Sequence, residues 1–126
     1  MGVFDIFRPK WKHSNPDVRA AAAKDINDEK ILIEMAAKDR EWFVRHNALD
    51  VLRSHNCGQH VYAHLARHAG DEEIRRKAIK KLTDQNVLQE VATSDKYRYV
   101  RDAAEHRLEE LRQNLWGEME QAQSAG

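Results

Sequence analysis

The chain contains little glycine, proline or cysteine, and it has no long hydrophobic run. Five glycines and two prolines in 126 residues leave few positions that must interrupt a helix. A single cysteine excludes an internal disulfide framework and fits a reducing compartment. No stretch approaches the roughly 18 apolar residues that a membrane-spanning helix needs. The N-terminal segment has its apolar residues before its basic cluster, the reverse of a secretory signal. We therefore expect a mostly helical cytoplasmic protein that does not enter the membrane.

The chain also has no excess of one charge. Lysine plus arginine and aspartate plus glutamate number 21 each. A protein that binds nucleic acid mainly through charge usually has a clear basic excess. The composition therefore argues against nucleic acid as the partner, and the length corresponds to a single domain.

What the chain does contain is one short pattern in four copies. Each copy opens with an apolar residue followed by arginine, and places an apolar residue, an alanine and another apolar residue four positions apart. The runs are Val18/Ala22/Ile26, Val44/Ala48/Leu52, Ile74/Ala78/Leu82 and Val100/Ala104/Leu108. Their first residues are separated by 26, 30 and 26 positions. A period of this size is typical of a solenoid, in which each unit buries its apolar face against its neighbours.

The copies predict helices only. A shift of 56 positions places residues 18–45 on residues 74–101 without a gap, with ten identities in 28 positions. The apolar periodicity predicts helices at 16–26, 29–38, 41–53, 59–69, 72–82, 85–93 and 97–116. No run alternates as a strand would, so the fold class is all-α. We expect one domain over 1–126, with a cap segment at 1–13, repeats at 14–111, and a helix end with a frayed tail at 112–126.

The pattern L..(I/V)A..D.....VR..A...L resembles the HEAT-like repeats of the armadillo/HEAT superfamily. It is most similar to the short bacterial and archaeal type that also occurs in phycobilisome lyases, and the similarity covers residues 14–111. The resemblance implies a right-handed α-α superhelix of about three and a half helical pairs, whose second helices line a concave face. It implies no catalytic residues and no cofactor. Because the unit is short, the related leucine-rich variant with one α and one 3₁₀ helix per unit remains a geometric alternative.

One arginine recurs in every repeat, and aspartates precede three of these arginines by a few residues. The arginines are Arg19, Arg45, Arg75 and Arg101, and the aspartates are Asp39, Asp71 and Asp95. In HEAT-like proteins, matching positions form hydrogen bonds and ion pairs between repeats. The resemblance therefore favours a structural role for these residues. Contact with a phosphate or a partner is the alternative.

The second repeat departs from the others. It has four more residues between Leu52 and Val61 than its siblings have at that place, and five of the seven histidines lie between residues 46 and 68. His60, His64 and His68 follow at i, i+4 and i+8, so they share one helix face. Two such histidines can chelate a metal ion, with Cys57 or His55 as a further ligand. A solvated histidine face adapted to a partner is the alternative, and Cys57 is either a reactive thiol or an ordinary loop residue.

Apolar residues also stand outside the repeats at both ends. They are Phe4, Phe7 and Trp11 at the start, and Leu108, Leu111, Leu115, Trp116 and Met119 at the end. The first group either covers the apolar end of the first repeat or contacts a membrane or nucleic acid. The second group is either a C-terminal cap or a helix-in-groove or dimer contact. We expect a monomer, or a weak dimer through the C-terminal helix.

These observations predict a non-enzymatic protein-binding module that holds a protein partner on its concave face. The side chains expected to contact the partner are Lys30, Glu34, His60, His64, Arg67, Asn86 and Glu90. One alternative, which rests on the resemblance, is an accessory to a lyase or to another cofactor-handling enzyme. The other is a nucleic-acid-binding HEAT-like protein. The aligned triplet of Lys30, His60 and Asn86 does not gather positive charge, which argues against the latter.

Overall fold

The computed structural model describes residues 3–125, with side chains from residue 5 onward. Two short 3₁₀ helices, Val3–Phe7 and Lys10–Lys12, precede seven α-helices, and the described residues contain no strand. The all-α prediction is therefore confirmed. The helices are α1 (Pro16–Ala23), α2 (Glu29–Lys38), α3 (Trp42–Ser54), α4 (Gln59–His68), α5 (Glu72–Ile79), α6 (Gln85–Ser94) and α7 (Arg98–Ala125).

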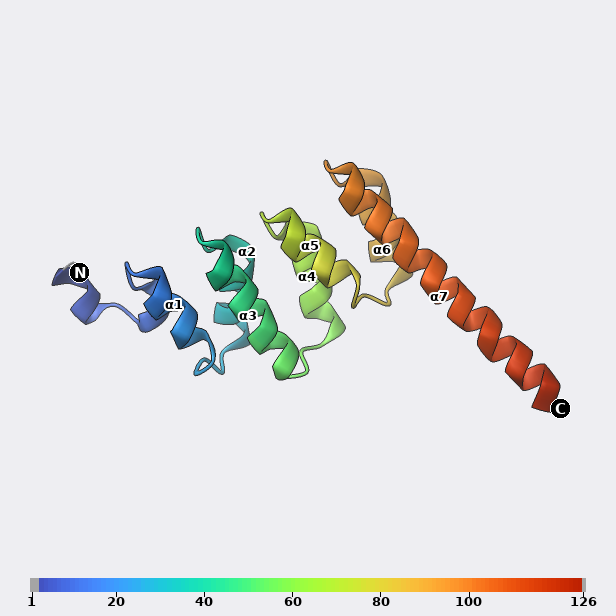
Figure 1. Ribbon diagram of the computed structural model, residues 1–126, viewed down its shortest axis with the longest axis horizontal. Helices are drawn as coiled ribbons and strands as arrows, with labels where there is room; N and C mark the ends of the chain where they lie inside the picture. Colours follow the sequence, from blue (N-terminus) through green and yellow to red (C-terminus); the bar gives the residue numbers. More distant parts are fainter. Residues whose placement is uncertain (1–2, 126) are drawn as a thin grey trace.

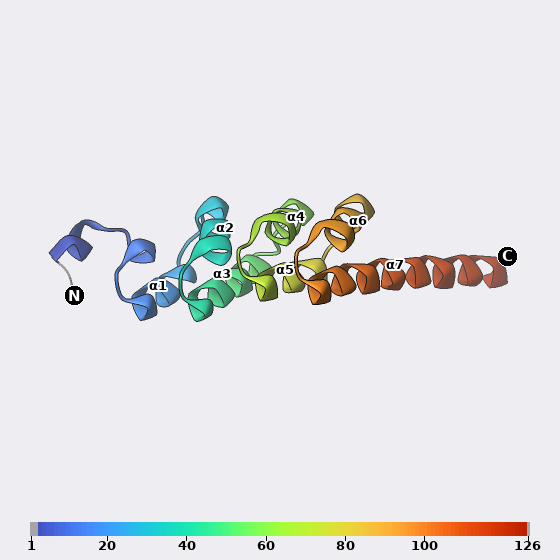
Figure 2. The same ribbon diagram turned by 90° about the horizontal axis from the view of Figure 1, so that it is seen from above.

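The chain alternates between two layers of helices. Helices α1, α3, α5 and α7 form a first layer, and α2, α4 and α6 form a second layer beside it (Figures 1 and 2). Each second-layer helix packs against the helix that follows it in the chain. The core lies between the layers, where the repeated stripe is fully buried at Val44, Ile74 and Val100. The repeated alanines at Ala48 and Ala78 are buried beside them.

Short polar side chains fix where the helices begin. Asn15, Asp28 and Asp84 each accept a hydrogen bond from a backbone N–H two residues later, at 2.9 Å. Such caps satisfy N–H groups that the first turn of a helix leaves without partners. Asparagine and aspartate are among the residue types preferred at this position. Asp71 caps α5 in the same way, at 2.8 Å from the nitrogen of Glu73.

The extra residues of the second repeat lengthen a helix. Helix α3 has 13 residues, whereas α1 and α5 have eight. It ends where Asn56 adopts a left-handed backbone, with φ at 54°. The N–H of Cys57 then donates to the carbonyl of Leu52, and the N–H of Asn56 donates to that of Arg53. This is a Schellman ending, which satisfies the last carbonyls of the helix. Cys57 is thus half-buried at a helix end and packs against the core.

Two helices are shorter than predicted. The stripe suggested that α1 and α5 continue to residues 26 and 82, but they end at Ala23 and Ile79. Each is followed by a tighter turn, in which the N–H of Asp25 donates to Ala22 and that of Leu82 donates to Ile79. The apolar residue at the end of the stripe therefore contributes to the core from a turn.

Helix α7 is longer than predicted. Its expected end was residue 116, but the helix continues to Ala125. Leu111 is the last of its residues that packs against the core, so the expected cap extends only that far. Leu115, Trp116 and Met119 are 54%, 59% and 46% exposed. We call residues 112–125 the α7 arm, and it projects beyond the body of the molecule (Figure 1).

The other end of the chain has a partial cover. Trp11 packs against the core, as a cap for the first repeat requires, whereas Phe7 is 86% exposed. The side chain of Phe4 lies outside the described residues. Within residues 3–125, no helix is both long enough and apolar enough to cross a membrane.

Candidate functional site

The side chains predicted to contact a partner lie on one face of the second layer. We call the set the second-layer face, and every member is exposed: Lys30, Glu34, His60, His64, Arg67, Asn86 and Glu90. They stand on α2, α4 and α6, opposite the buried residues Leu32, Leu65 and Leu88 of the same helices. The helical period had predicted this exposure, because polar and apolar residues of each helix fall on opposite sides.

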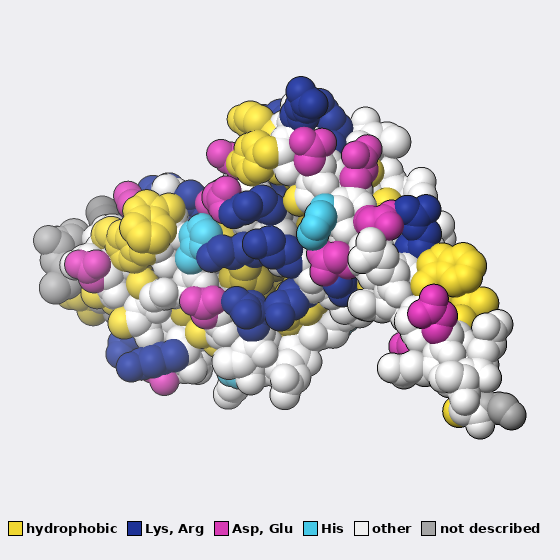
Figure 3. Space-filling view, turned by 45° about the vertical axis from the view of Figure 1, so that its right-hand side comes forward, with side chains coloured by type: hydrophobic (Ala, Val, Ile, Leu, Met, Phe, Trp, Pro, Cys, Tyr) yellow, Lys and Arg dark blue, Asp and Glu magenta, His cyan; other side chains and the backbone are white. Residues whose placement is uncertain are grey.

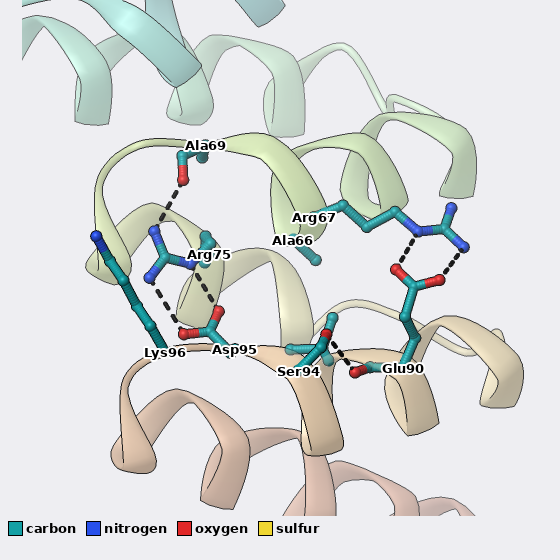
Figure 4. A pocket seen from close by; sticks show the side chains of 9 residues that line it. Ala66, Arg67, Ala69, Arg75, Glu90, Ser94, Asp95 and Lys96 are labelled. Atoms are coloured by element: carbon teal, nitrogen blue, oxygen red, sulfur yellow. Dashed lines mark hydrogen bonds and ion pairs between the residues drawn. The ribbon is translucent and has the colours of Figure 1, made fainter.

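Two ion pairs join neighbouring helices across this face. Arg67 on α4 donates to both carboxylate oxygens of Glu90 on α6, at 2.8 and 3.2 Å (Figure 4). Hydrogen bonding from Arg67 lowers the pKa of Glu90. His60 Nε2 lies 2.7 Å from a carboxylate oxygen of Glu29 on α2. Two predicted contact residues thus bind each other, and Glu29 was missed because its pairing depends on the spacing between helices.

A recess of about 300 Å³ lies beside the Arg67–Glu90 pair, between α4 and α6. Ser94 and Lys96 also line it, and Figure 4 shows Lys96 near Arg75 and Asp95. A second recess, of about 550 Å³, occupies the corresponding place one repeat earlier. Its lining includes Lys38, Asp39, Arg45, His68 and Asp71. Both recesses lie where successive repeats meet. The recurring arginines therefore line them, Arg75 in the first and Arg45 in the second.

Those arginines connect successive repeats. Arg75 donates to both carboxylate oxygens of Asp95, at 2.8 and 3.2 Å, and to the carbonyl of Ala69 at 2.8 Å. Arg19 binds Asp39 in the same way, at 3.0 and 3.2 Å. The predicted hydrogen bonds and ion pairs between repeats are therefore confirmed. The arginine that partners each aspartate is the one from the preceding repeat.

The second repeat uses a different aspartate position for the same purpose. Arg45 Nε donates to Asp71 at 2.8 Å and its Nη1 donates to the carbonyl of Asp39 at 2.8 Å. Asp71 stands at the N-cap of α5, two residues after the position that corresponds to Asp95. The carboxylate of Asp71 both caps α5 and pairs with Arg45. The ion pair between these two repeats is therefore kept although the aspartate stands two positions later.

The histidines share a helix face without forming a larger cluster. The rings of His64 and His68 are 4.9 Å apart, whereas His60 is paired with Glu29. Burial lowers the pKa of His64, and the charges of His68 and Lys38 lower it further. In the part of the chain that the structure describes, no group of three or more histidine, cysteine, aspartate or glutamate side chains is placed to hold a metal ion.

Cys57 belongs to a separate recess. It lines a hollow near the C-terminal end of α3 together with Arg53, Tyr62 and Lys81. Burial raises the pKa of Tyr62 to about 12, and a hydrogen bond with Cys57 contributes in the same direction. The thiol is therefore not grouped with His60, His64 and His68, as the predicted metal site would require.

The second-layer face offers donors, acceptors and charges of both signs at fixed positions. Such a surface suits noncovalent recognition of a polar surface, in which complementary charges select the partner. Lys38 and His68, which sequence reasoning left out of the contact set, extend it toward the recesses at the ends of α2 and α4. Comparisons of this chain with protein-family models, with curated proteins and with solved structures find no match.

Proposed function

We propose that this chain is a HEAT-like repeat protein that binds another protein through its second-layer face and has no enzymatic activity of its own. In this proposal the helical pairs form a right-handed superhelix of about three and a half units, and α2, α4 and α6 line its concave side. The fold class and the alternation of two layers are consistent with that geometry.

One observation supports the functional part of the proposal above the others. Buried positions keep their character from repeat to repeat, as at Ala36 and Ala66, whereas exposed positions on the same helices change. Lys30, His60 and Asn86 occupy one aligned exposed position and differ in charge and size. A shared scaffold with a varied surface is expected when recognition, and not packing, sets the exposed residues.

The charges of the face favour a protein over the other partners. Arg67 is neutralised by Glu90 and His60 faces Glu29, so the face has no row of free cations for a nucleic-acid backbone. Ligand and cofactor sites are mostly apolar, whereas the recess beside Arg67 is lined by charged and polar side chains. A partner with a polar surface of mixed charge fits this face better than either alternative.

The test compares two double variants with the same change in net charge. His64→Glu with Arg67→Glu alters the second-layer face, and Lys24→Glu with Asn47→Glu alters exposed first-layer positions. The partner is first identified by affinity capture with the wild-type chain, and purified partner is then titrated by calorimetry. We expect the first variant to abolish binding at an unchanged melting temperature, and the second to bind like wild type. Loss of binding only in the Lys24/Asn47 variant would reject the proposed face.

A further inference from the structure

The α7 arm is a helix with an apolar side that nothing in its own chain covers. Leu115, Trp116 and Met119 lie within five consecutive residues, and about half of each residue's surface is exposed. Exposed apolar groups of this size on one helix side are typical of contact surfaces. The arm is continuous with the packed part of α7, which lies against α5 and α6. At 1.5 Å per residue, the 14 residues of the arm extend roughly 20 Å. Because α7 is one continuous helix, the arm points away from the repeats and does not fold back onto them.

The neutral chain divides into two sections of opposite charge. Residues 105–126 contain five glutamates and two arginines, a net charge of −3 with histidine neutral. Residues 1–104 contain 19 lysines and arginines and 16 aspartates and glutamates, a net charge of +3. The arm itself contributes Glu118, Glu120 and Arg112 to the acidic section, a net charge of −1. Three cations of residues 1–104, at positions 8, 10 and 12, precede the repeats. Overall neutrality hides this separation, which composition alone does not reveal.

Lysine and arginine side chains gather on the first layer. We call the cluster at α5 and the end of α3 the basic face; its members are Arg53, Arg76, Lys77, Lys80 and Lys81. The sequence signal is the run RRKAIKK, which places most of these residues on or just after one short helix. Figure 3 shows lysine and arginine side chains crossing the middle of one surface, with acidic side chains around them.

Several of these cations have no carboxylate partner. Lys77 Nζ lies 2.8 Å from His46 Nδ1, and burial followed by the charge of Lys77 lowers the pKa of His46, which favours the neutral ring. Neither Lys80 nor Lys81 forms an ion pair with any described residue. Arg76 donates to Glu73, but its Nε is buried without a hydrogen-bond partner. By contrast, the arginine of the second-layer face is paired with Glu90. Arg53 also has a carboxylate nearby, that of Asp50 at 3.6 Å. The uncompensated charge of the basic face is therefore that of its three lysines.

We propose that the α7 arm of one copy packs on the basic face of a second copy, and that the two copies exchange arms about a two-fold axis. Glu118 and Glu120 bring the negative charge that the lysines lack, and Trp116 brings an aromatic ring that a lysine can cover. Each copy then gives one arm and receives one, so the assembly closes at a dimer. The exposed Trp42, in ring contact with His46, adds apolar surface at the edge of the basic face.

Two charge-reversed variants test this exchange. Glu118→Lys with Glu120→Lys makes the arm basic, and Lys80→Glu with Lys81→Glu reverses two cations of the basic face. Sedimentation velocity over a concentration series, at low and high salt, gives the dimer dissociation constant. We expect wild type to dimerise less strongly at high salt, and each variant alone to weaken self-association by about tenfold or more. An equal mixture of the two variants should form a heterodimer, because each altered surface then meets its complement.

The outcomes separate this dimer from other occupants of the arm. If Lys80→Glu with Lys81→Glu dimerises like wild type, the arms pair with each other and the exchange is wrong. If wild type stays monomeric at every concentration, the arm binds a different protein or none, and the proposal is equally wrong. The two glutamates replaced in the arm variant do not pack against the core. Its melting temperature, measured by circular dichroism, should therefore equal that of wild type. None of the four residues belongs to the second-layer face, so failure here leaves the proposed function untouched.

Discussion

Arg75 and Asp95 form a bidentate ion pair that joins the third repeat to the loop before α7. The two bonds measure 2.8 and 3.2 Å, and the side chains are only 7% and 6% exposed. Arg75 also donates to the carbonyls of Ala69 and Gly70, at 2.8 and 3.2 Å. A planar guanidinium with five donors suits this combination of a carboxylate and two carbonyls.

Removing Arg75 should destabilise the protein strongly. Arg75→Ala leaves the carboxylate of Asp95 buried without its counter-ion, and breaking a buried pair in this way costs about 3–5 kcal/mol. Arg101→Ala is the matched control: Arg101 holds the same place in the last repeat, but its bond runs to the carbonyl of Asp95 at 2.6 Å. Among the described residues it has no carboxylate partner. Urea denaturation should show the larger loss for Arg75→Ala, and equal losses would contradict this ranking.

The same pair makes stability depend on pH. Burial alone would raise the pKa of Asp95, but hydrogen bonds from Arg75 and from the backbone of Tyr97 outweigh it, and the pKa is lowered from 3.8. Because the folded-state value is the lower one, the contribution of Asp95 is fully present above the unfolded pKa. It is lost as pH falls through the folded pKa.

Acid titration of the melting temperature measures this contribution. We expect Asp95→Asn to lower stability at neutral pH and to make the loss of stability in acid shallower than in wild type. Asp25→Asn, at an exposed position after α1, is the control and should leave the curve unchanged. If the melting temperature of Asp95→Asn falls with pH in parallel with that of wild type, the carboxyl of Asp95 is not the cause of the pH dependence.

The buried alanines set how closely the layers approach. Ala78 is fully buried between α5 and its neighbours, as are Ala48 and Ala104 at the equivalent places. Ala78→Leu inserts three carbon atoms into a packed core, which should destabilise by about 1–3 kcal/mol. Ala21→Leu, on the exposed side of α1, is the control and should be nearly neutral. An unchanged denaturation midpoint for Ala78→Leu would show that the repeat alignment is wrong.

The sequence predicted the features that depend on local periodicity. The stripe through Val44 and Ile74 follows from residue types at fixed spacing, so its buried position was predicted correctly. The end of α7 was predicted at residue 116, but the helix continues through Gly117 to Ala125. A single glycine costs about 1 kcal/mol in a helix, and the glutamine and alanine residues that follow favour helix continuation. Helix α3 was predicted at 41–53 and lies at Trp42–Ser54, so its greater length was predicted correctly.

Contacts between the exposed side chains of neighbouring second-layer helices were not predicted from the sequence. Arg67 and Glu90 were both predicted as exposed contact residues, yet their ion pair depends on how α4 and α6 are placed relative to each other. The pairing of His60 with Glu29 has the same origin. Both pairs reduce the charge that the second-layer face presents, and they also fix the positions of side chains that seemed independent in the sequence.

The last prediction concerns the binding of added metal ions by the three histidines of α4, His60, His64 and His68. The neighbouring rings of His64 and His68 form an i, i+4 pair on α4, and two such histidines bind zinc or nickel with few further requirements. His60 is held by Glu29, so we expect it to contribute little. Added nickel should raise the melting temperature of tag-free protein, and the rise should disappear in His64→Ala and persist in His60→Ala. It should also fade in acid, because protons compete with the metal ion for the ring nitrogens. If His60→Ala removes the rise in melting temperature as completely as His64→Ala does, all three histidines bind the metal ion. His60 then leaves Glu29 to coordinate the metal.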